Sequence, residues 1–187
     1  MVQIHSPRPF FPMPKLDSER LLLRRICQDD ITDITEWENG GDSEREARLF
    51  LDFCFQQYET RGDGPWGILL KETGKLIGNC GYIGIRHFCG EVNYYVAPKY
   101  RGRGFATEAL KILLNLGFTE LGLLRTQARC DRDNLSSERV MQKIGMKFNG
   151  TVQNLSADGG KSSEQIMYAI LREDFEMAQQ VSHHTAP

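Results

Sequence analysis

The most constraining feature of the sequence is a strand that passes through a basic, glycine-containing loop straight into a helix. The run Glu91–Ala97 has strand character and stops at Pro98, the loop Lys99–Gly104 holds three cations and two glycines, and Phe105–Phe118 has helical apolar spacing. Glycines allow backbone N–H groups to approach an anion closely, and a helix N-terminus adds partial positive charge. The segment therefore has the properties of a pyrophosphate-binding turn, although a plain strand-to-helix connection has the same outline.

Two familiar phosphate-binding motifs do not fit this loop. A P-loop requires Gly-Lys followed by Ser or Thr, and residues 99–107 contain no such triplet. A dinucleotide-binding turn requires a third glycine in an early β-α-β unit. Here Thr107 stands at the position of that glycine, and the loop lies in the middle of the chain. The loop therefore belongs to neither of these nucleotide folds.

The segments before and after the loop follow different patterns. Apolar runs predict strands at residues 21–26, 66–70, 76–85, 91–97, 125–130, 146–152 and 165–171. Helical spacing predicts helices at residues 29–37, 43–58, 105–118, 137–144 and 174–181, the second of them behind a capping box at 43–46. Strands first and β-α-β-α units afterwards imply one mixed α/β sheet with helices on both faces.

Length and composition favour one globular domain. The 187 residues, 40% of them hydrophobic, suffice for a substantial core, and no repeat or interior linker divides the chain. We expect a flexible segment at residues 1–14, one domain at 15–176 and a tail at 177–187. No apolar run approaches the ~18 residues of a membrane span. Five cysteines without a C-x-x-C pair predict a reduced, cytoplasmic protein with neither disulfides nor a metal site.

The net charge of −2 hides a strong polarity along the chain. Between Lys99 and Lys147 there are ten basic and five acidic residues, a local charge of +5. Between Asp29 and Asp63 there are eleven acidic residues and three arginines, a local charge of −8. This separation indicates an anionic ligand at one site and a cationic ligand at another, unless both runs simply face solvent.

Four ordered motifs resemble those of one protein family. Arg101-x-x-Gly104-x-Ala106 matches the [RQ]-x-x-G-x-[GA] loop that binds acyl-CoA, and residues 91–109 around it agree with the same family. The further matches are Asn134-x-x-Ser137, Met141-x-Lys143-x-Gly145 and Tyr168–Arg172. On these residues the sequence resembles the GNAT superfamily of N-acetyltransferases, and more closely its RimJ/RimL-type branch, over residues 16–175. It departs from the family at Asn93, where glycine is usual, and at Met146, where phenylalanine is frequent.

The resemblance implies a fold and a co-substrate. The expected fold is GNAT-like, with a mostly antiparallel sheet of six to seven strands. In it the strand ending at Val96 splays from the strand beginning near Arg125, and the pantetheine arm of acetyl-CoA lies in the gap. The residues that the resemblance assigns to acetyl-CoA are Tyr95, Val96, Arg101, Gly102, Arg103, Gly104, Phe105, Ala106, Thr107, Asn134, Ser137 and Lys143. Asn134 is also suited to cap the helix that follows it, and Lys143 to lie in solvent.

Three residues are candidates for the acid–base chemistry. By the resemblance, Glu91 would accept the proton of the attacking amine, or it is simply a charge at a strand start. Ser137 and Tyr168 are both candidates to protonate the departing thiolate, and their alternatives are a hydroxyl at a helix start and a packed aromatic. Cys130 has no histidine near it in the sequence, so we expect direct transfer without a covalent acyl-enzyme.

The resulting hypothesis is an acetyl-CoA-dependent N-acetyltransferase that acts through a ternary complex and needs no metal. Its acceptor would be a primary amine, either a protein N-terminus or a small cationic amine, and the acidic run 29–63 would border the acceptor site, which this family forms partly from its first two helices. The alternatives are a module that binds a polyanion such as RNA, and a GNAT-like chain that binds acyl-CoA without turnover. Under the main hypothesis we expect no nucleic-acid or membrane partner, and either a monomer or a homodimer.

Overall fold

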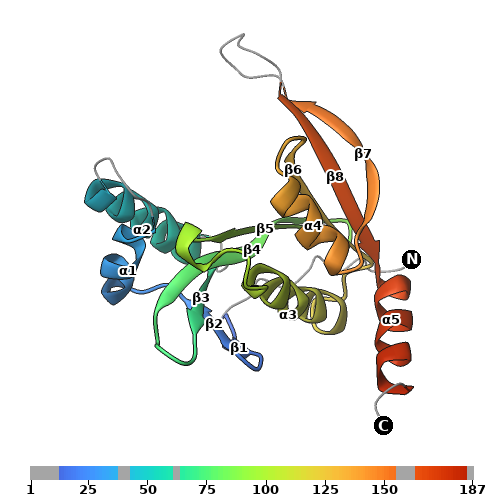
Figure 1. Ribbon diagram of the computed structural model, residues 1–187, viewed down its shortest axis with the longest axis horizontal. Coiled ribbons are helices and arrows are strands. Elements are labelled where there is room, and N and C mark those ends of the chain that lie inside the picture. The colour runs from blue at the N-terminus through green and yellow to red at the C-terminus, as the bar shows by residue number, and fades with distance from the viewer. Residues whose placement is uncertain (1–12, 38–42, 61–63, 155–162, 185–187) are drawn as a thin grey trace.

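One eight-stranded sheet organises the protein (Figure 1). The structure is a computed structural model that describes residues 13–37, 43–60, 64–154 and 163–184. The strands are β1 (Leu16–Asp17), β2 (Leu21–Arg25), β3 (Trp66–Leu70), β4 (Leu76–Arg86), β5 (Cys89–Val96), β6 (Arg125–Asp131), β7 (Lys147–Asn154) and β8 (Ser163–Leu171). Their order is β1-β2-β3-β4-β5-β6-β8-β7. Within this sheet β5 and β6 run parallel and the other neighbours antiparallel, which confirms the expected mixed α/β fold.

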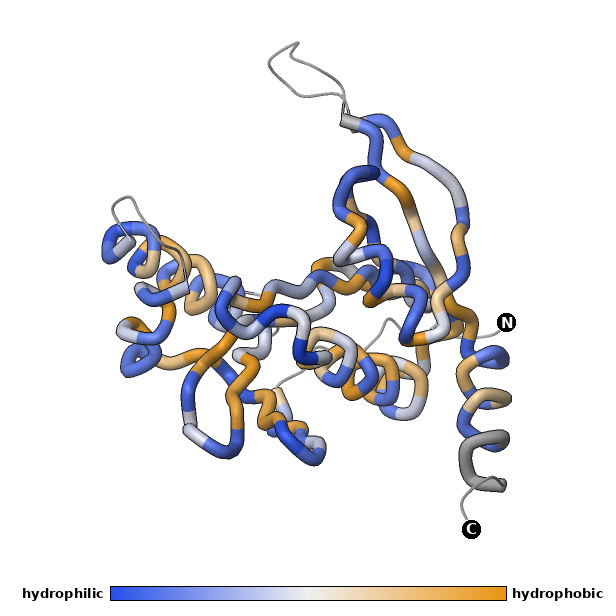
Figure 2. The backbone as a smooth tube through the Cα atoms, viewed as in Figure 1, coloured by the Kyte–Doolittle hydropathy of each residue, from blue (hydrophilic) through white to orange (hydrophobic). Residues whose placement is uncertain are grey.

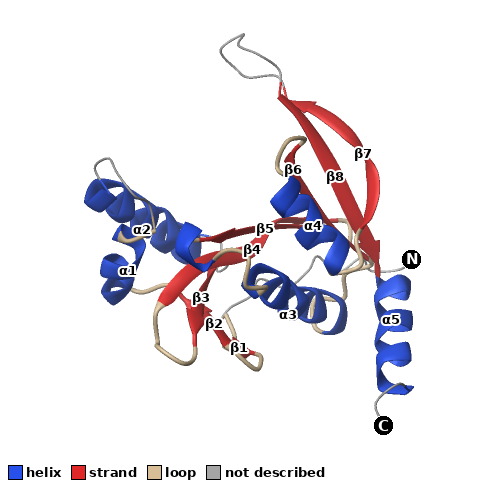
Figure 3. Cartoon of the chain, in the orientation of Figure 1, coloured by secondary structure: helices blue, strands red, loops and turns tan. Residues whose placement is uncertain are grey.

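Helices connect the strands and cover the sheet (Figure 3). They are α1 (Ile31–Thr35), α2 (Ser43–Thr60), α3 (Phe105–Thr119), α4 (Leu135–Lys143) and α5 (Arg172–His184), with short 3-10 helices at η1 (Gln28–Asp30) and η2 (Pro98–Tyr100). Hydrophobic and hydrophilic residues alternate along them (Figure 2), as expected of helices that bury one face. The helices lie where apolar spacing predicted them.

Two details differ from the prediction. The sheet has eight strands rather than six or seven, because Leu16 and Asp17 pair with β2, and a run of two residues has no detectable periodicity. Ser43 is the first residue of α2 rather than its cap, and the residue before it lies outside the described residues. The helix predicted at 174–181 is present as α5, which begins at Arg172 and ends at His184.

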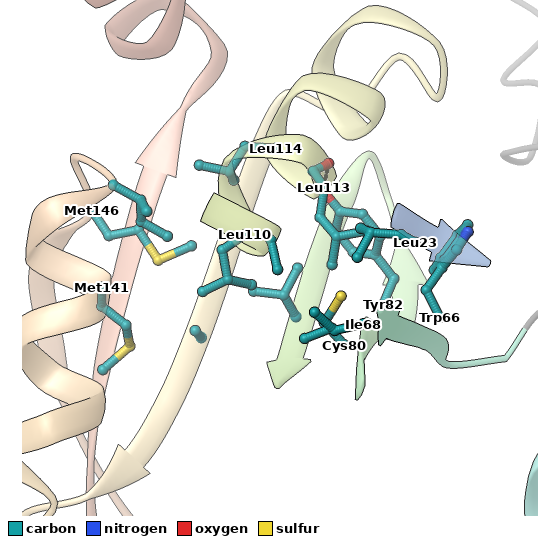
Figure 4. Packing of buried hydrophobic residues seen from close by; sticks show 14 of the residues in the cluster. Leu23, Trp66, Ile68, Cys80, Tyr82, Leu110, Leu113, Leu114, Met141 and Met146 are labelled. Carbon is teal, nitrogen blue, oxygen red and sulfur yellow. Dashed lines mark hydrogen bonds between the residues drawn. The ribbon is translucent and has the colours of Figure 1, made fainter. Parts of the chain in front are cut away.

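Two hydrophobic clusters pack on the two faces of the sheet. The larger cluster joins α3 and α4 to the central strands, and Figure 4 shows Leu110 and Leu113 of α3 lying against Cys80 and Tyr82 of β4. The smaller cluster joins α1 and α2 to the opposite face and includes Trp37, which is 6% exposed. The sheet therefore separates an α3/α4 face from an α1/α2 face.

The sheet opens between β5 and β6. These strands pair only where Cys89–Glu91 lie beside Arg125–Gln127, and beyond Glu91 they part, so the expected splayed pair is present. On the other side of β5, the register with β4 shifts between Tyr82 and Gly84. A bulge of this kind increases the local twist of a strand pair. It lies opposite the point where β5 leaves β6, and it therefore helps to explain the gap.

Candidate active site

The loop before α3 presents backbone amides at a helix N-terminus. Gly102 and Gly104 have φ angles of +74° and +83°, in the left-handed region that glycine adopts most readily. Gly104 is the N-cap residue of α3 and no side chain caps the helix there. The N–H of Glu108 donates to the carbonyl of Gly104, so the amides of residues 105–107 have no acceptor within the helix. Such a helix end is suited to bind an anion.

The loop arginines lie over aromatic rings. The Arg101 guanidinium lies 5.5 Å from the centre of the Tyr95 ring, and its Nε donates to the carbonyl of Val96 at 2.8 Å. Arg103 lies 5.1 Å from the ring of Phe105. Both arginines are exposed, so they add positive charge at the mouth of the gap while the backbone of the loop supplies the directed N–H groups.

The register of β5 decides which backbone groups face the gap. The N–H of Ala97 donates to the carbonyl of Ile77 on β4, and in an antiparallel pair hydrogen-bonded positions alternate with those that point away. The backbone of Tyr95 is therefore used in the ladder with β4. The backbone groups of Tyr94 and Val96 point towards the gap instead. The sequence prediction named the backbone groups of Tyr95 and Val96 for this part of the gap and did not name Tyr94.

Tyr94 also connects β5 to α4 across the open part of the sheet. Its hydroxyl donates to the backbone carbonyl of Ser137 at 3.0 Å, and burial raises the pKa of Tyr94 to about 12. The Oδ1 atom of Asn134 accepts from the N–H of Ser137 at 3.1 Å and from Ser136 Oγ at 2.8 Å. Asn134 is thus the cap of α4, and its Nδ2 amide makes no hydrogen bond within the described residues. Lys143 is exposed at the other end of α4.

Glu91 lies where β5 and β6 part, on the α1/α2 face of the sheet that also carries the Tyr95 side chain. Its Oε1 accepts from Arg129 Nε at 2.8 Å and Nη2 at 2.7 Å, and its Oε2 accepts from Gln127 Nε2 at 3.1 Å. The side chain of Glu91 is 18% exposed. The structure therefore holds this carboxylate in place with two β6 partners that the sequence did not reveal.

Tyr168 lies away from Glu91, on the α3/α4 face of β8. Its hydroxyl donates to Glu138 Oε1 at 2.6 Å and accepts from Gln142 Nε2 at 3.1 Å. The hydrogen bond to Glu138 is the main reason that the pKa of Tyr168 is raised. Since β6 separates β8 from the gap, the structure brings Ser137 and Tyr94 together there and leaves the Tyr168 hydroxyl occupied by α4.

A pocket of about 240 Å³ lies between α1, α2 and the strands β4 and β5. Its lining is mainly aromatic and apolar, with a few polar groups. The lining residues are Ile34, Thr35, Trp37, Ser43, Glu46, Ala47, Phe50, Asn79 and Tyr95. The Trp37 ring lies 5.6 Å from Phe50 and 5.5 Å from Tyr95. These rings and one carboxylate form a surface that suits an organic cation.

The acidic run contributes less to this pocket than its charge suggests. Glu46 is the one carboxylate among the lining residues that the structure describes. Asp30 pairs with Arg24, Asp33 with Lys75, and Glu36 with Lys99. These ion pairs tie α1 and its preceding turn to the sheet and to η2, so most of the charge in this part of the run is structural.

Four of the ten basic residues between Lys99 and Lys147 form ion pairs. Lys99, Arg129, Arg132 and Lys147 each form an ion pair with an acidic residue.

The described residues contain no cluster of three or more His, Cys, Asp or Glu side chains that is suited to a metal ion. No helix in the described ranges is both long and apolar enough to cross a membrane.

An acyl carrier with an anionic head and a long arm suits both the open end of α3 and the gap beside it. The fold and the site thus define the class of CoA-dependent acyltransferases. Within that class, a family model described as "Acetyltransferase (GNAT) domain" matches residues 17–147. The chain belongs to this GNAT acetyltransferase family, whose members use acetyl-CoA and transfer its acetyl group to amines.

The chain is also similar to individual acetyltransferases in sequence and in structure. The uncharacterized N-acetyltransferase YoaA of Bacillus subtilis is 28% identical over 173 residues, which cover 85% of this chain and 97% of that protein. A GNAT-family acetyltransferase of Bacillus anthracis has a crystal structure with a TM-score of 0.73 at 27% identity, covering 86% of this chain and 99% of that one. The spermidine N(1)-acetyltransferase of Escherichia coli K12 is 26% identical over 89 residues, 48% of each chain. The protein is accordingly an N-acetyltransferase by family.

Proposed function

We propose that this protein transfers the acetyl group of acetyl-CoA directly to a primary amine within a ternary complex, as a RimJ/RimL-type member of its family. The observation that carries the proposal is the gap between β5 and β6. It has the open N-terminus of α3 at its mouth, Glu91 on the α1/α2 face and Ser137 beside it on the α3/α4 face. The thioester of acetyl-CoA in the gap then has a proton acceptor, Glu91, on one side and a proton donor, Ser137, on the other.

The loop and the gap bind different parts of acetyl-CoA. The amides of residues 102–107 bind the pyrophosphate, and Arg101 and Arg103 add positive charge near it. The backbone groups of Tyr94 and Val96 hydrogen-bond the pantetheine arm, as does the Nδ2 amide of Asn134. Lys143 at the end of α4 binds the phosphate of the nucleotide.

The transfer needs two proton movements. The neutral amine nitrogen attacks the thioester carbon, the carbon–sulfur bond breaks, and an amide product and a thiolate result. Glu91 accepts the proton that the amine loses, and Ser137 protonates the thiolate. A strand rises about 3.3 Å per residue, so Glu91 lies roughly 13 Å along β5 from Tyr95 in the aromatic pocket. The proton therefore travels through water unless the acceptor extends from the pocket along Asn93.

The aromatic pocket supports a cationic acceptor. Trp37, Phe50 and Tyr95 present ring faces, and Glu46 adds one negative charge, a combination that holds an ammonium group. Both acceptor classes, a protein N-terminus and a small cationic amine, carry such a group. The similarity to the spermidine N(1)-acetyltransferase of E. coli, which covers 48% of that protein, supports the second class.

The cellular compartment and the oligomeric state are also part of the proposal. All five cysteines are free, as is typical of proteins in a reducing compartment such as the cytoplasm. We place the protein there, as a monomer or a homodimer, without a nucleic-acid or membrane partner.

Calorimetric titration of the purified protein with acetyl-CoA, followed by an acceptor screen for thiol release, tests this function. Binding in the micromolar range together with acetylation of at least one amine supports it. Failure to bind at hundreds of micromolar contradicts the co-substrate assignment. Binding without turnover across protein N-terminal peptides, polyamines and aminoglycosides supports the non-catalytic alternative instead.

A further inference from the structure

We propose that Arg20 is a positioning residue for the CoA pyrophosphate: it neutralises Glu108 in the first turns of α3 and fixes the loop at Arg103, so that this helix end accepts an anion. The inference rests on the proposed binding of acetyl-CoA at the α3 N-terminus. It concerns a residue in the turn before β2, more than eighty positions away from the loop in the sequence.

Glu108 is surrounded by donors from that turn. Its Oε2 accepts from Arg20 Nε at 2.7 Å, and its Oε1 accepts from the Arg20 backbone N–H at 3.0 Å and from Ser18 Oγ at 2.7 Å. Burial of the Glu108 carboxyl acts to raise its pKa, but the hydrogen bonds from Ser18 and Arg20 outweigh burial, and the pKa is lowered. The carboxylate is therefore charged at neutral pH.

Arg20 also contacts the loop itself. Its Nη1 donates to the backbone carbonyl of Arg103 at 3.1 Å, and its guanidinium lies 4.7 Å from the ring centre of Phe105. Phe105 is the first residue of α3 and is 3% exposed, and Arg103 lies over the same ring. One side chain thus touches the loop, the start of the helix and its first acidic residue.

The arrangement has an electrostatic consequence. A helix N-terminus attracts anions through a partial positive charge that is confined to its first turn. Glu108 lies one turn into α3, so its carboxylate opposes that charge and repels a pyrophosphate at the same place. The positive charge of the Arg20 guanidinium neutralises the Glu108 carboxylate and so removes this repulsion. Its hydrogen bond also holds the Arg103 carbonyl, which leaves the following amides to face a ligand.

The alternative is that Arg20 only ties the β1–β2 turn to α3. Two ligands separate these roles, because acetyl-CoA carries the pyrophosphate and S-acetylpantetheine does not. A positioning role affects the first ligand and spares the second. A general loosening of the fold affects both.

The experiment compares Arg20→Gln, Arg20→Lys, Glu108→Gln and the Arg20→Gln/Glu108→Gln double variant. We expect Arg20→Gln to raise the KM for acetyl-CoA roughly tenfold, with kcat at saturation and kcat/KM for S-acetylpantetheine within twofold of the parent protein. Arg20→Lys keeps the charge and recovers most of the loss. The double variant, which removes both charges, recovers binding to within about threefold.

Lys71→Gln is the matched control. Lys71 Nζ donates to Asp17 Oδ2 at 2.9 Å and to the Ser18 carbonyl, so the substitution loosens the same turn without touching Glu108 or Arg103. It should leave the KM for acetyl-CoA unchanged.

The inference is overturned if Arg20→Gln weakens the binding of both thioesters equally, if the double variant binds acetyl-CoA as weakly as Arg20→Gln, or if Lys71→Gln reproduces the loss. Glu108→Gln alone should bind acetyl-CoA at least as well as the parent, so a loss there also overturns the inference. If the parent protein itself binds no acetyl-CoA, it is the proposed function that fails.

Discussion

Two nitrogen atoms of Arg129, Nε and Nη2, both donate to the single oxygen Oε1 of Glu91, at 2.8 and 2.7 Å. Gln127 occupies the other carboxylate oxygen. Glu91 is thereby fixed on the α1/α2 face of the sheet, at the root of the gap, with its charge partly neutralised from β6. The position of the Glu91 carboxylate, the proposed base, therefore depends on Arg129 and Gln127.

The first prediction concerns Glu91. Glu91→Gln keeps the side chain's shape and removes its ability to accept a proton, so we expect kcat to fall about 10²- to 10³-fold while the KM for acetyl-CoA changes little. Steady-state kinetics at saturating acetyl-CoA provide the check. A variant with the parent's kcat would leave Glu91 as a structural partner of Arg129.

The second prediction separates the two acid candidates. Ser137 lies beside the gap, whereas the Tyr168 hydroxyl is already bound to Glu138 and Gln142. Ser137→Ala should therefore lower kcat about tenfold or more, and Tyr168→Phe should leave it within about twofold. Thiol release measured at saturating acetyl-CoA tests both variants. A larger loss in Tyr168→Phe than in Ser137→Ala would reverse the assignment.

The third prediction concerns the acceptor. Glu46 lines the aromatic pocket, so Glu46→Gln should raise the KM for a diamine about three- to tenfold and leave the KM for acetyl-CoA unchanged. Asp52→Asn removes an exposed charge from the same helix outside the pocket lining and is the matched control. Equal KM values in the two variants would exclude Glu46 from the acceptor site.

The fourth prediction follows from a buried ion pair. Asp30 is 5% exposed, and it accepts from Arg24 Nη1 and Nη2, both at 2.7 Å, and from the N–H of Cys27 at 2.8 Å. Burial acts to raise the pKa of Asp30, but these hydrogen bonds outweigh it and lower the pKa. A carboxyl whose pKa is lower in the folded state stabilises the fold above its unfolded value, about 3.9, and loses this effect as the pH falls through the folded pKa.

Asp30→Asn should therefore lower the free energy of unfolding by roughly 2–3 kcal/mol at pH 7, and by less as the pH drops below about 4. Urea unfolding at several pH values measures the difference. A difference that stays constant down to the lowest pH would show that Asp30 contributes packing rather than charge.

The sequence predicted what depends on local pattern. Periodicity located the amphipathic α2 and α3, and glycines at two positive-φ positions identified the loop between β5 and α3. These features need only residues that are close in sequence. The mixed sheet and its parted strands followed from the order of elements and from the family resemblance.

What the sequence did not predict depends on register and on distant contacts. Nothing local distinguishes Tyr94 from Tyr95, and only the pairing with β4 directs the backbone of Tyr94 to the gap. Arg20 and Glu108 are 88 positions apart, and no spacing rule joins them. The sequence also did not predict that Asp33 and Glu36 of the acidic run pair with the distant lysines Lys75 and Lys99.

The last prediction concerns the tight turn between β4 and β5. Arg86 pairs with Cys89, so His87 and Phe88 alone form the turn, with φ angles of +49° and +61°. A two-residue turn with two positive φ values favours Asn and Gly, and other L-residues are strained there. Since His87 is exposed, His87→Asn should raise the free energy of unfolding by about 0.5 kcal/mol and the Tm by one to two degrees, roughly. The β-branched His87→Val should lower the free energy by about 1 kcal/mol. Thermal unfolding of the parent protein and the two variants measures the order of their stabilities. A His87→Val variant at least as stable as His87→Asn would contradict the strain at this turn.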